Sequence, residues 1–394
     1  MFKEKVFLKF LIVLLFLVVL VSNFFYKWDH QHYAYLADAF KNGRMDLPLA
    51  SAFDSARYGG KFFWPLGIFP AILIFPASLI FGFWNYWQPV FTVILAFFTF
   101  GLVFKISDYF KFSKNDSLWL SVFFVFATPL LGAILVPTSW HFAHLCAVLF
   151  VLLSVFEFFT KKRLWLVGIL VSAAFLSRPL TIFTLLFFIW LTIFQNQNKK
   201  ITIKNLIYLL IPVFFSIGIF GLYNYLRFQN PFEAGYRYQF VDADGVFVSA
   251  GGQYLSFSYP LKNFFKIFLA GLIPVKLWAN EFILNPLNYS GSGVSIFLTS
   301  PLLILAFLAP FKNKFVVPLW ITVVVISLLL IFSFGTGGLQ IGSRYSLDFL
   351  PLMFILVLIQ MKGKVKLWQK ALILIQIIYI LLLFVPLAKQ RGLL

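Results

Sequence analysis

The sequence predicts an all-α protein that crosses a lipid bilayer about eleven times. Of its 394 residues, 61% are hydrophobic and 11% are charged, whereas about 25% of the residues in a soluble domain are charged. Apolar runs of the length that a spanning helix needs, about 20 residues, recur along the whole chain. This composition excludes a soluble globular protein and a disordered chain. The single cysteine, Cys146, excludes a disulfide scaffold.

The first apolar run follows a basic start and lacks a small-residue cleavage site, which predicts a retained helix with its N-terminus in the cytoplasm. The predicted spans are 6–25, 88–105, 117–135, 140–160, 164–178, 179–194, 206–226, 294–311, 315–334, 347–361 and 367–387. The run 66–83 contains Pro70 and Pro76 and is expected to lie in the interface or to re-enter. If it spanned, three lysine-rich loops would lie outside, against the positive-inside rule.

The net charge of +19 is therefore interpreted as basic residues that flank helices on the cytoplasmic side, and nucleic acid is not expected as a partner. Most acidic residues fall on the outer side. We expect a core over residues 1–230, with an outer loop at 26–65. A more variable C-terminal membrane region, 231–394, would carry the outer loop 231–293. This places a multi-pass protein in the cell membrane with its polar chemistry on the outer face.

The outer loop after the first span begins with a candidate functional carboxylate. Tyr33, Leu36, Ala37 and Phe40 form one face of a short amphipathic helix that Gly43 would end. Asp29 precedes this helix, next to His30. It would either cap the helix N-terminus or act as a carboxylate at the membrane interface.

Basic and aromatic residues at several outer positions are candidates for a substrate cavity. Tyr58 and Lys61 lead into the proline-rich run, where they would bind a lipid phosphate or anchor the interface. His141 and His144 lie three positions apart, so both imidazoles would face one cavity or be wetted at a helix mouth. Tyr236 would stack on a sugar ring or anchor the interface.

Two arginines complete the set. Arg178 lies between two spans, where a proline turn places it at the outer surface, either to bind an anion or to snorkel. Arg344, Tyr345 and Asp348 follow a glycine-rich outer loop. Arg344 and Asp348 are four apart, so they would form an internal ion pair or bind a donor phosphate at the helix start.

These features together resemble the GT-C superfamily of membrane glycosyltransferases, and most closely the bacterial branch of the dolichyl-phosphate-mannose–protein mannosyltransferase type. The resemblance covers roughly residues 1–230. It is carried by the topology, the run from Asp29 to Leu47, Tyr58-Gly59-Gly60-Lys61 leading into Gly67 and Pro70, and Phe175-Leu176-Ser177-Arg178-Pro179.

The resemblance implies an enzyme that moves a sugar from a polyprenyl-phosphate donor to an acceptor hydroxyl at the outer face, with inversion. The acceptor, whether protein, lipid or glycan, is not identified. Asp29 would be the general base, and Lys61, Arg178 and Arg344 would contact the donor phosphate. His30 stands where the family has a second acid, which leaves metal dependence open: a divalent metal is possible but not indicated, and no other cofactor is implied.

Two other functions remain open at this stage. The alternative is a transporter or flippase for a lipid-linked or small polar substrate, which charged residues buried mid-helix and paired repeats would favour. The sequence shows few of either. A non-enzymatic assembly factor would be favoured if function survived changes at Asp29, Arg178 and Arg344.

Overall fold

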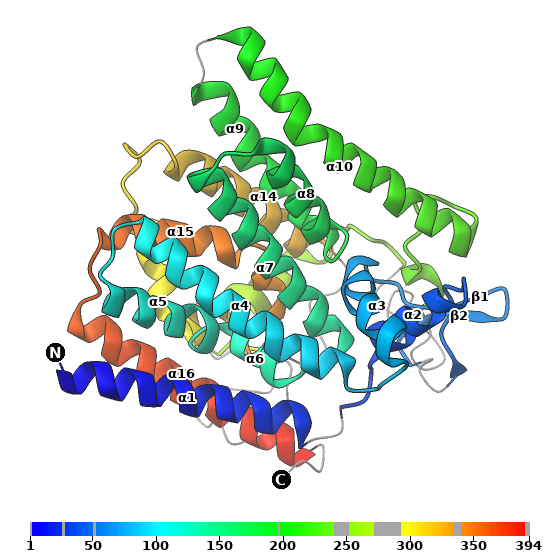
Figure 1. Cartoon of the computed structure of the whole chain (residues 1–394), viewed down its shortest axis with the longest axis horizontal. Helices are drawn as coiled ribbons and strands as arrows, with labels where there is room; N and C mark the ends of the chain where they lie inside the picture. Colours follow the sequence, from blue (N-terminus) through cyan, green and yellow to red (C-terminus); the bar gives the residue numbers. More distant parts are fainter. Residues whose placement is uncertain are drawn as a thin grey trace.

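The protein is a multi-pass bundle of apolar helices with one two-stranded hairpin (Figure 1). The structure is a computed structural model and describes residues 2–25, 28–49, 53–195, 198–239, 252–271, 293–333 and 340–390. Most of the predicted outer loop 231–293 and part of the glycine-rich loop before Gln340 lie outside these residues. The fold class predicted from composition, an all-α polytopic membrane protein, is confirmed.

Among the described residues, five helices are each long and apolar enough to cross a bilayer: α1 (Phe2–Phe24), α4 (Trp87–Tyr109), α7 (Ser139–Thr160), α10 (Lys199–Phe228) and α16 (Leu367–Gln390). A sixth span is made if α5 (Lys114–Phe126) and α6 (Pro129–Leu135), which meet at a 62° bend, cross together. Pro129, at the start of α6, has no backbone N–H and so cannot donate to a carbonyl of the preceding helix, which explains the break at this point.

The remaining helices are shorter. They are α2 (His32–Lys41), α3 (Phe69–Phe81), α8 (Leu164–Phe175), η2 (Pro179–Thr184), α9 (Leu185–Gln195), η3 (Tyr236–Tyr238), α12 (Pro260–Phe264), η4 (Phe265–Leu269), α13 (Ile296–Thr299), η6 (Pro301–Leu308), α14 (Val316–Phe332), η7 (Arg344–Asp348) and α15 (Leu350–Met361). Every predicted span coincides with one helix or with two consecutive ones. The count of eleven stays a prediction, because several of these helices are individually shorter than a bilayer requires.

One end of the bundle, the α2 end, carries the non-spanning elements α2, α3 and the hairpin of β1 (Ala56–Tyr58) and β2 (Lys61–Phe63) (Figure 1, right). α2 matches its predicted amphipathic pattern, since Tyr33, Leu36 and Ala37 are buried and Gly43 follows with a positive φ of 62°. α3 has 13 residues, which at 1.5 Å per residue is too short to cross about 30 Å of hydrocarbon.

A single buried amide joins three elements at the α2 end. The Gln88 side chain, at the start of α4, accepts hydrogen bonds from the backbone N–H of Tyr33 at 2.8 Å and from the Ser139 hydroxyl at 3.0 Å. Its amide nitrogen donates to the carbonyl of Pro137 at 3.3 Å. Ser139 in turn donates to the carbonyl of His30 at 2.6 Å. The starts of α2, α4 and α7 are therefore fixed relative to one another.

The opposite end, the Lys370 end, is held by charges. The Lys370 ammonium lies 2.8 Å from a carboxylate oxygen of Glu4 and 3.4 Å from one of Asp116. Asn115 and Trp119 also donate to Glu4, at 2.9 and 3.0 Å. These contacts join the starts of α1, α5 and α16.

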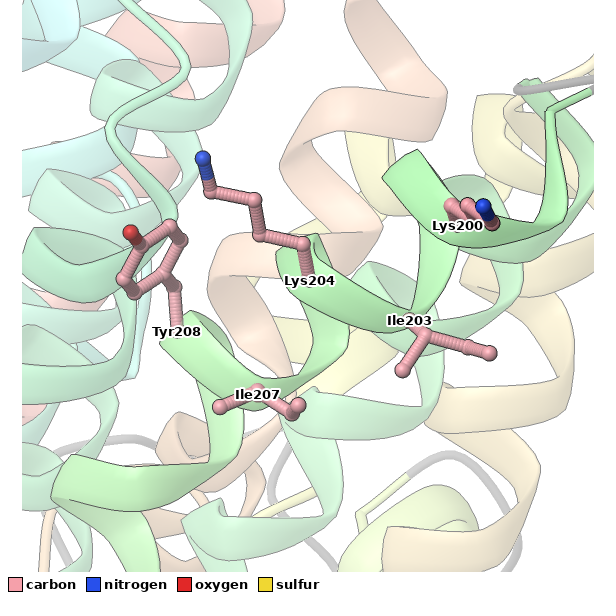
Figure 2. Close-up of a pocket in the computed structure, with 5 residues that line it drawn as sticks. All are labelled: Lys200, Ile203, Lys204, Ile207 and Tyr208. Atoms are coloured by element: carbon pink, nitrogen blue, oxygen red, sulfur yellow. The ribbon is translucent and has the colours of Figure 1, made fainter.

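α10, the longest of the described helices, runs along the edge of the bundle from beside α9 to the α2 end (Figure 1, green). Near its start, Lys200, Ile203, Lys204, Ile207 and Tyr208 line a shallow groove of ≈ 350 Å³ (Figure 2). Lysines and a tyrosine above apolar side chains are typical of anchoring at a membrane interface. This groove lies at the other end of α10 from the polar site described below.

Candidate active site

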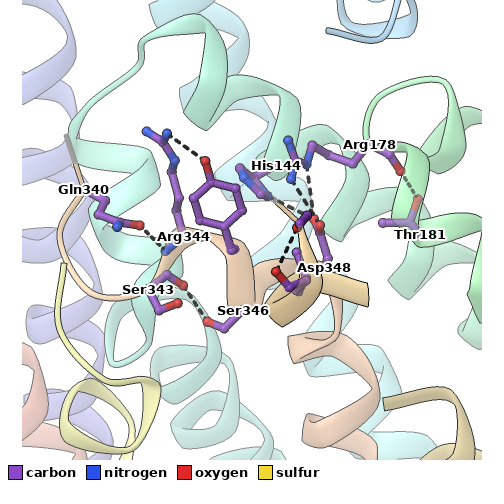
Figure 3. A network of polar contacts seen from close by, with 11 residues as sticks. His144, Arg178, Thr181, Gln340, Ser343, Arg344, Ser346 and Asp348 are labelled. Carbon is purple, nitrogen blue, oxygen red and sulfur yellow. Dashed lines mark hydrogen bonds and ion pairs between the residues drawn. The ribbon is translucent and has the colours of Figure 1, made fainter. Parts of the chain in front are cut away.

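A buried carboxylate organises the polar site. Asp348, at the end of η7, is 1% exposed and accepts hydrogen bonds from Arg178 at 3.4 Å (Nε) and 3.2 Å (Nη2) (Figure 3). The His144 Nδ1 atom on α7 lies 3.1 Å from the same carboxylate. Three distant parts of the chain thus meet at Asp348. A buried carboxylate is stable only when it is paired in this way.

Two guanidinium groups lie over one aromatic ring beside this acid. The Tyr345 ring is 5.6 Å from the guanidinium carbon of Arg178 and 5.1 Å from that of Arg344. Arg344 also donates to the Tyr345 hydroxyl at 3.3 Å. Both distances are within the range of cation–π attraction, so the ring stabilises two cations close to each other. Two guanidinium groups held close to each other in this way are suited to bind an anion.

The backbone next to Arg178 is held by a close approach of two segments. The amide of Phe69 donates to the carbonyl of Leu176 at 3.0 Å. A Cβ atom on Gly67 would lie 2.0 Å from the same carbonyl oxygen. Only glycine fits here, so the start of α3 is seated on the end of α8, two residues before Arg178.

The structure corrects two local expectations from the sequence. Arg178 was expected at the outer surface, but 12% of its side chain is exposed and it points inward to Asp348. An ion pair between Arg344 and Asp348 was one expectation from their spacing, but Asp348 pairs with Arg178 instead. η7 is a 3₁₀ helix, in which residues three apart align, so the spacing of four does not bring these two side chains together.

Asp54, which we did not select from the sequence as a site residue, lies in this charged region. It is 9% exposed and accepts a hydrogen bond from the Gln239 side chain, and Trp140 is within hydrogen-bonding range. Burial raises the pKa of Asp54 to about 6, although the positive charge of Arg344 opposes this rise. The only sequence signal for Asp54 is its position in the same outer loop as Asp29.

Tyr236, in η3, lies within electrostatic range of Arg178, Tyr345 and Asp54. Burial raises the pKa of Tyr236 to about 12, so its phenol is neutral and can donate a hydrogen bond at neutral pH. The structure thus places Tyr236 with Arg178, Arg344, Tyr345, Asp348 and His144 in one region.

Asp29 is placed differently from these residues. It is exposed, and α2 begins at His32 with Gln31 at the N-cap position, so Asp29 does not cap this helix. The structure records no direct contact between Asp29 and Lys61, Arg178 or Arg344. Its role as general base stays a prediction.

His30, the neighbour of Asp29, belongs to an aromatic cluster at the α2 end. Its ring lies 5.1 Å from Trp140 and 4.7 Å from Phe53. Since Trp140 and Phe53 flank Asp54, the cluster connects His30 to the polar site through side chains rather than through a direct contact with the arginines.

Three other predicted residues have separate surroundings. Lys61 is exposed and lies 4.0 Å from Asp46 on the rim of the hairpin. The Tyr58 ring packs on that of Tyr238, with centroids 4.9 Å apart. The His141 Nδ1 atom is 2.8 Å from the Thr138 hydroxyl, and the side chain lies within electrostatic range of Arg344 and His144. His141 therefore borders the polar site, whereas the structure records no contact that joins Lys61 to it.

No three His, Cys, Asp or Glu side chains among the described residues gather in a way that could hold a metal ion.

Comparisons with known proteins give few matches. No model of a known family matches the chain, and no curated protein matches it. The chain is similar to two crystal structures of ArnT from Cupriavidus metallidurans. The structure bound to undecaprenyl phosphate has a TM-score of 0.47 at 12% identity, over 90% of this chain and 60% of that chain. The apo structure has a TM-score of 0.49 at 10% identity, over 92% and 61%.

This chain therefore spans about 60% of the length of the ArnT chains that it matches.

Proposed function

We propose that this protein is a membrane glycosyltransferase that moves a sugar from a polyprenyl-phosphate donor to an acceptor hydroxyl, with inversion at the anomeric carbon. The observation that carries the proposal is the pair of guanidinium groups over the Tyr345 ring, beside the buried Asp348. Arg344 is within electrostatic range of Asp54, which lies between α2 and β1, so this cationic centre is near the α2 end of the bundle. A phosphate carried on a lipid is the anion that such a location favours.

The chemistry follows from the charge that develops as the donor breaks. The acceptor oxygen bonds to the anomeric carbon, the bond from that carbon to the phosphate oxygen breaks, and polyprenyl phosphate leaves with the electron pair. Arg178 and Arg344 would stabilise the negative charge that grows on the phosphate. A carboxylate would take the proton from the acceptor hydroxyl.

Two carboxylates compete for the role of the base. Asp29 is the residue that the resemblance implies. The geometry favours Asp54, because it lies within electrostatic range of Arg344 and Tyr236, and because a pKa of about 6 suits proton transfer near neutral pH. Lys61 is proposed as an accessory phosphate contact at the rim of the site.

The proposed site faces the outer side of the cell membrane, with the N-terminus in the cytoplasm. This orientation places the basic loop residues Lys111, Lys161 and Lys199 inside, as the positive-inside rule requires. A lipid-linked donor also fits a sequence that lacks a Gly-x-x-x-x-Gly-Lys-Ser/Thr loop for nucleotides.

The experiment uses purified protein in nanodiscs with a panel of polyprenyl-phosphate sugars, and measures the release of polyprenyl phosphate. We compare the wild type with Asp54→Asn, Asp29→Asn and the control Asp38→Asn, which changes an acid that pairs with Lys41 on α2. Release that is lost in Asp54→Asn and kept in Asp29→Asn and the control supports Asp54 as the base. The reverse pattern supports Asp29. Binding without release, combined with donor movement across the bilayer, would support a flippase instead.

A further inference from the structure

Three buried hydrogen-bonding groups at the α2 end make no hydrogen bond of normal geometry with the described residues, although two of them, the Tyr33 hydroxyl and the Trp64 indole, lie within hydrogen-bonding range of each other. They are the Tyr33 hydroxyl on α2, the Trp64 indole N–H directly after β2, and the Tyr223 hydroxyl on α10. Tyr33 and Trp64 are 0% exposed and Tyr223 is 2% exposed. Leaving one such group unsatisfied costs about 1–3 kcal/mol, so three together are a feature that a purely structural core would avoid.

The three groups form one cluster around a buried arginine. The Tyr33 and Trp64 rings meet edge to face, with centroids 5.9 Å apart. The Arg227 guanidinium lies 3.7 Å from the centroid of the Tyr223 ring and donates to the carbonyl of Trp64 at 2.5 Å. Tyr33 is within electrostatic range of both Tyr223 and Arg227. Three segments distant in sequence thus place their unsatisfied groups in one place.

Two neighbouring side chains have their hydrogen bonds satisfied, whereas Gln31 Oε1 and His141 Nε2 at the same end also lack a partner among the described residues. Both side-chain ends of Gln88 have partners, and both ring nitrogens of His32 lie within 3.0 Å of an oxygen. The chain also contains 55 phenylalanines against 16 tyrosines, so apolar rings are its ordinary way of filling space. Tyrosine at positions 33 and 223 therefore retains hydroxyl groups that packing does not require.

Tyr236 connects this cluster to the cationic centre. It is within electrostatic range of Arg178 and Tyr345 on one side and of Tyr33 and Arg227 on the other. The cluster and the cationic centre therefore both lie near Tyr236.

We infer that Tyr33, Trp64 and Tyr223 form a subsite that recognises the hydroxyl groups of the donor sugar. This inference rests on the proposed function, because it takes the anion at Arg178 and Arg344 to be the donor phosphate. Phenols donate and accept, and an indole N–H donates, so the three groups suit a ring with several hydroxyls. Arg227 is a positioning residue, since it fixes Tyr223 and the Trp64 backbone.

The test separates the sugar from the phosphate. We measure the affinity of the purified protein for bare polyprenyl phosphate and for the panel of polyprenyl-phosphate sugars, in the wild type, Tyr33→Phe and Tyr223→Phe. Each variant removes one hydroxyl without changing the ring. We expect the sugar-bearing donor that binds best to bind about 3- to 10-fold more weakly, and bare polyprenyl phosphate to bind unchanged.

Tyr379→Phe is the matched control. Its hydroxyl, on α16, is also buried without a hydrogen-bond partner among the described residues. It should leave both affinities unchanged. All three variants should melt at or slightly above the wild-type temperature, because each removes an unsatisfied polar group.

Three results would overturn the inference. Tyr33→Phe and Tyr223→Phe could weaken the binding of bare polyprenyl phosphate and of the sugar-bearing donor equally, which would assign the hydroxyls to the phosphate or to folding. They could change neither affinity, in which case the hydroxyls bind water only. A wild type that binds bare polyprenyl phosphate as tightly as every sugar-bearing donor would also exclude a sugar subsite. Failure of the wild type to bind polyprenyl phosphate at all is a separate outcome, which rejects the proposed function itself.

Discussion

Arg178 contacts both carboxylate oxygens of Asp348, through Nε at 3.4 Å and Nη2 at 3.2 Å. The two residues are 170 positions apart in the sequence. Their pairing joins the end of α8 to η7 and thereby connects the two predicted halves of the chain, 1–230 and 231–394. It also fixes the guanidinium group beside the Tyr345 ring, where the proposed donor phosphate would bind.

Breaking this pair should destabilise the protein strongly. Arg178→Met leaves the buried Asp348 with His144 alone, and a buried charge that loses its partner typically costs about 3–5 kcal/mol. Arg178→Lys keeps the charge but loses the two-pronged contact, so its melting temperature should lie in between. Thermal unfolding in detergent measures both. Lys61→Met is the control, because its exposed pair with Asp46 contributes under about 1 kcal/mol. Equal melting temperatures for all three variants would contradict the buried pairing.

The pH dependence of the transfer rate should report the ionisation of Asp54. If Asp54 is the base, the transfer rate rises with pH through about 6, as the carboxyl loses its proton. Asp54→Asn should abolish activity, and Asp54→Glu, which keeps a carboxylate on a side chain that is one methylene longer, should shift this limb rather than remove it. A pH–rate profile of the wild type checks the first expectation. A limb near the ordinary aspartate pKa would assign the base elsewhere.

The free energy of unfolding should fall over the same pH range in which the transfer rate rises. The pKa of Asp54 is raised in the fold, so the folded state holds this proton more tightly than the unfolded chain does. The wild type should therefore lose stability as pH rises from about 4 to about 6, by at most about 3 kcal/mol. In Asp54→Asn this loss should be absent. Melting temperatures measured across this pH range compare the two proteins directly.

Gly67→Ala should disturb the site from a distance. The added Cβ would lie 2.0 Å from the carbonyl oxygen of Leu176, and a backbone atom cannot move aside as a flexible side chain can. We expect a loss of about 1–3 kcal/mol and weaker binding of polyprenyl phosphate, because Arg178 follows closely. Gly101→Ala on α4 is the control, since nothing lies within 4 Å of its added Cβ. Similar melting and binding in both variants would show that this close approach does not position Arg178.

At the Lys370 end, Lys370→Met should loosen the starts of α1, α5 and α16. The substitution removes the cation shared by Glu4 and Asp116, both partly buried, and should cost about 1–3 kcal/mol. Lys114→Met provides the comparison, because its 3.0 Å pair with Asp108 is exposed and should contribute little. Thermal unfolding distinguishes them. If Lys114→Met were the more damaging change, the charge cluster at Lys370 would not hold these helices.

The orientation of the protein in the membrane can be tested by labelling introduced cysteines, because the wild type should give no signal. Cys146 is buried, so a membrane-impermeant thiol reagent should not label the wild type. Lys61→Cys should be labelled from outside intact cells, whereas Lys111→Cys should be labelled only after the membrane is opened. Labelling of Lys111→Cys in intact cells would reverse the proposed sidedness.

Patterns within short stretches of the sequence were sufficient to predict the helices, but not the hairpin of β1 and β2. The length and apolarity of each run located the helices, and the spacing of Tyr33, Leu36 and Ala37 predicted the buried face of α2. These features depend on neighbours in the chain, so they can be read locally. The broken helix at Thr128–Pro129 was missed, because the run 117–135 is apolar throughout and only its proline marks the bend.

The partners of the site residues could not be predicted in this way. The spacing of four suggested an ion pair between Arg344 and Asp348. In the fold, the partners of Asp348 are Arg178 and His144, which lie 170 and 204 positions away in the sequence. The hydrogen bond to Asp54 comes from Gln239, 185 positions later. No motif surrounds Asp54, so its burial and raised pKa follow from the fold alone. The assignments of Asp29, Lys61 and the other site residues stay predictions that the experiments above address.

α10 has a consequence for the bilayer around the protein. With 30 residues it is about 45 Å long, whereas the hydrocarbon of a typical membrane is about 30 Å thick. Lys200 and Lys204 near its start favour one headgroup region, and Arg227 at its end is locked to the Trp64 backbone. The helix must therefore tilt, or extend beyond the acyl chains, by an amount set by lipid length. Transfer rates should consequently respond to acyl-chain length in reconstituted vesicles, even where every side chain in the site is unchanged.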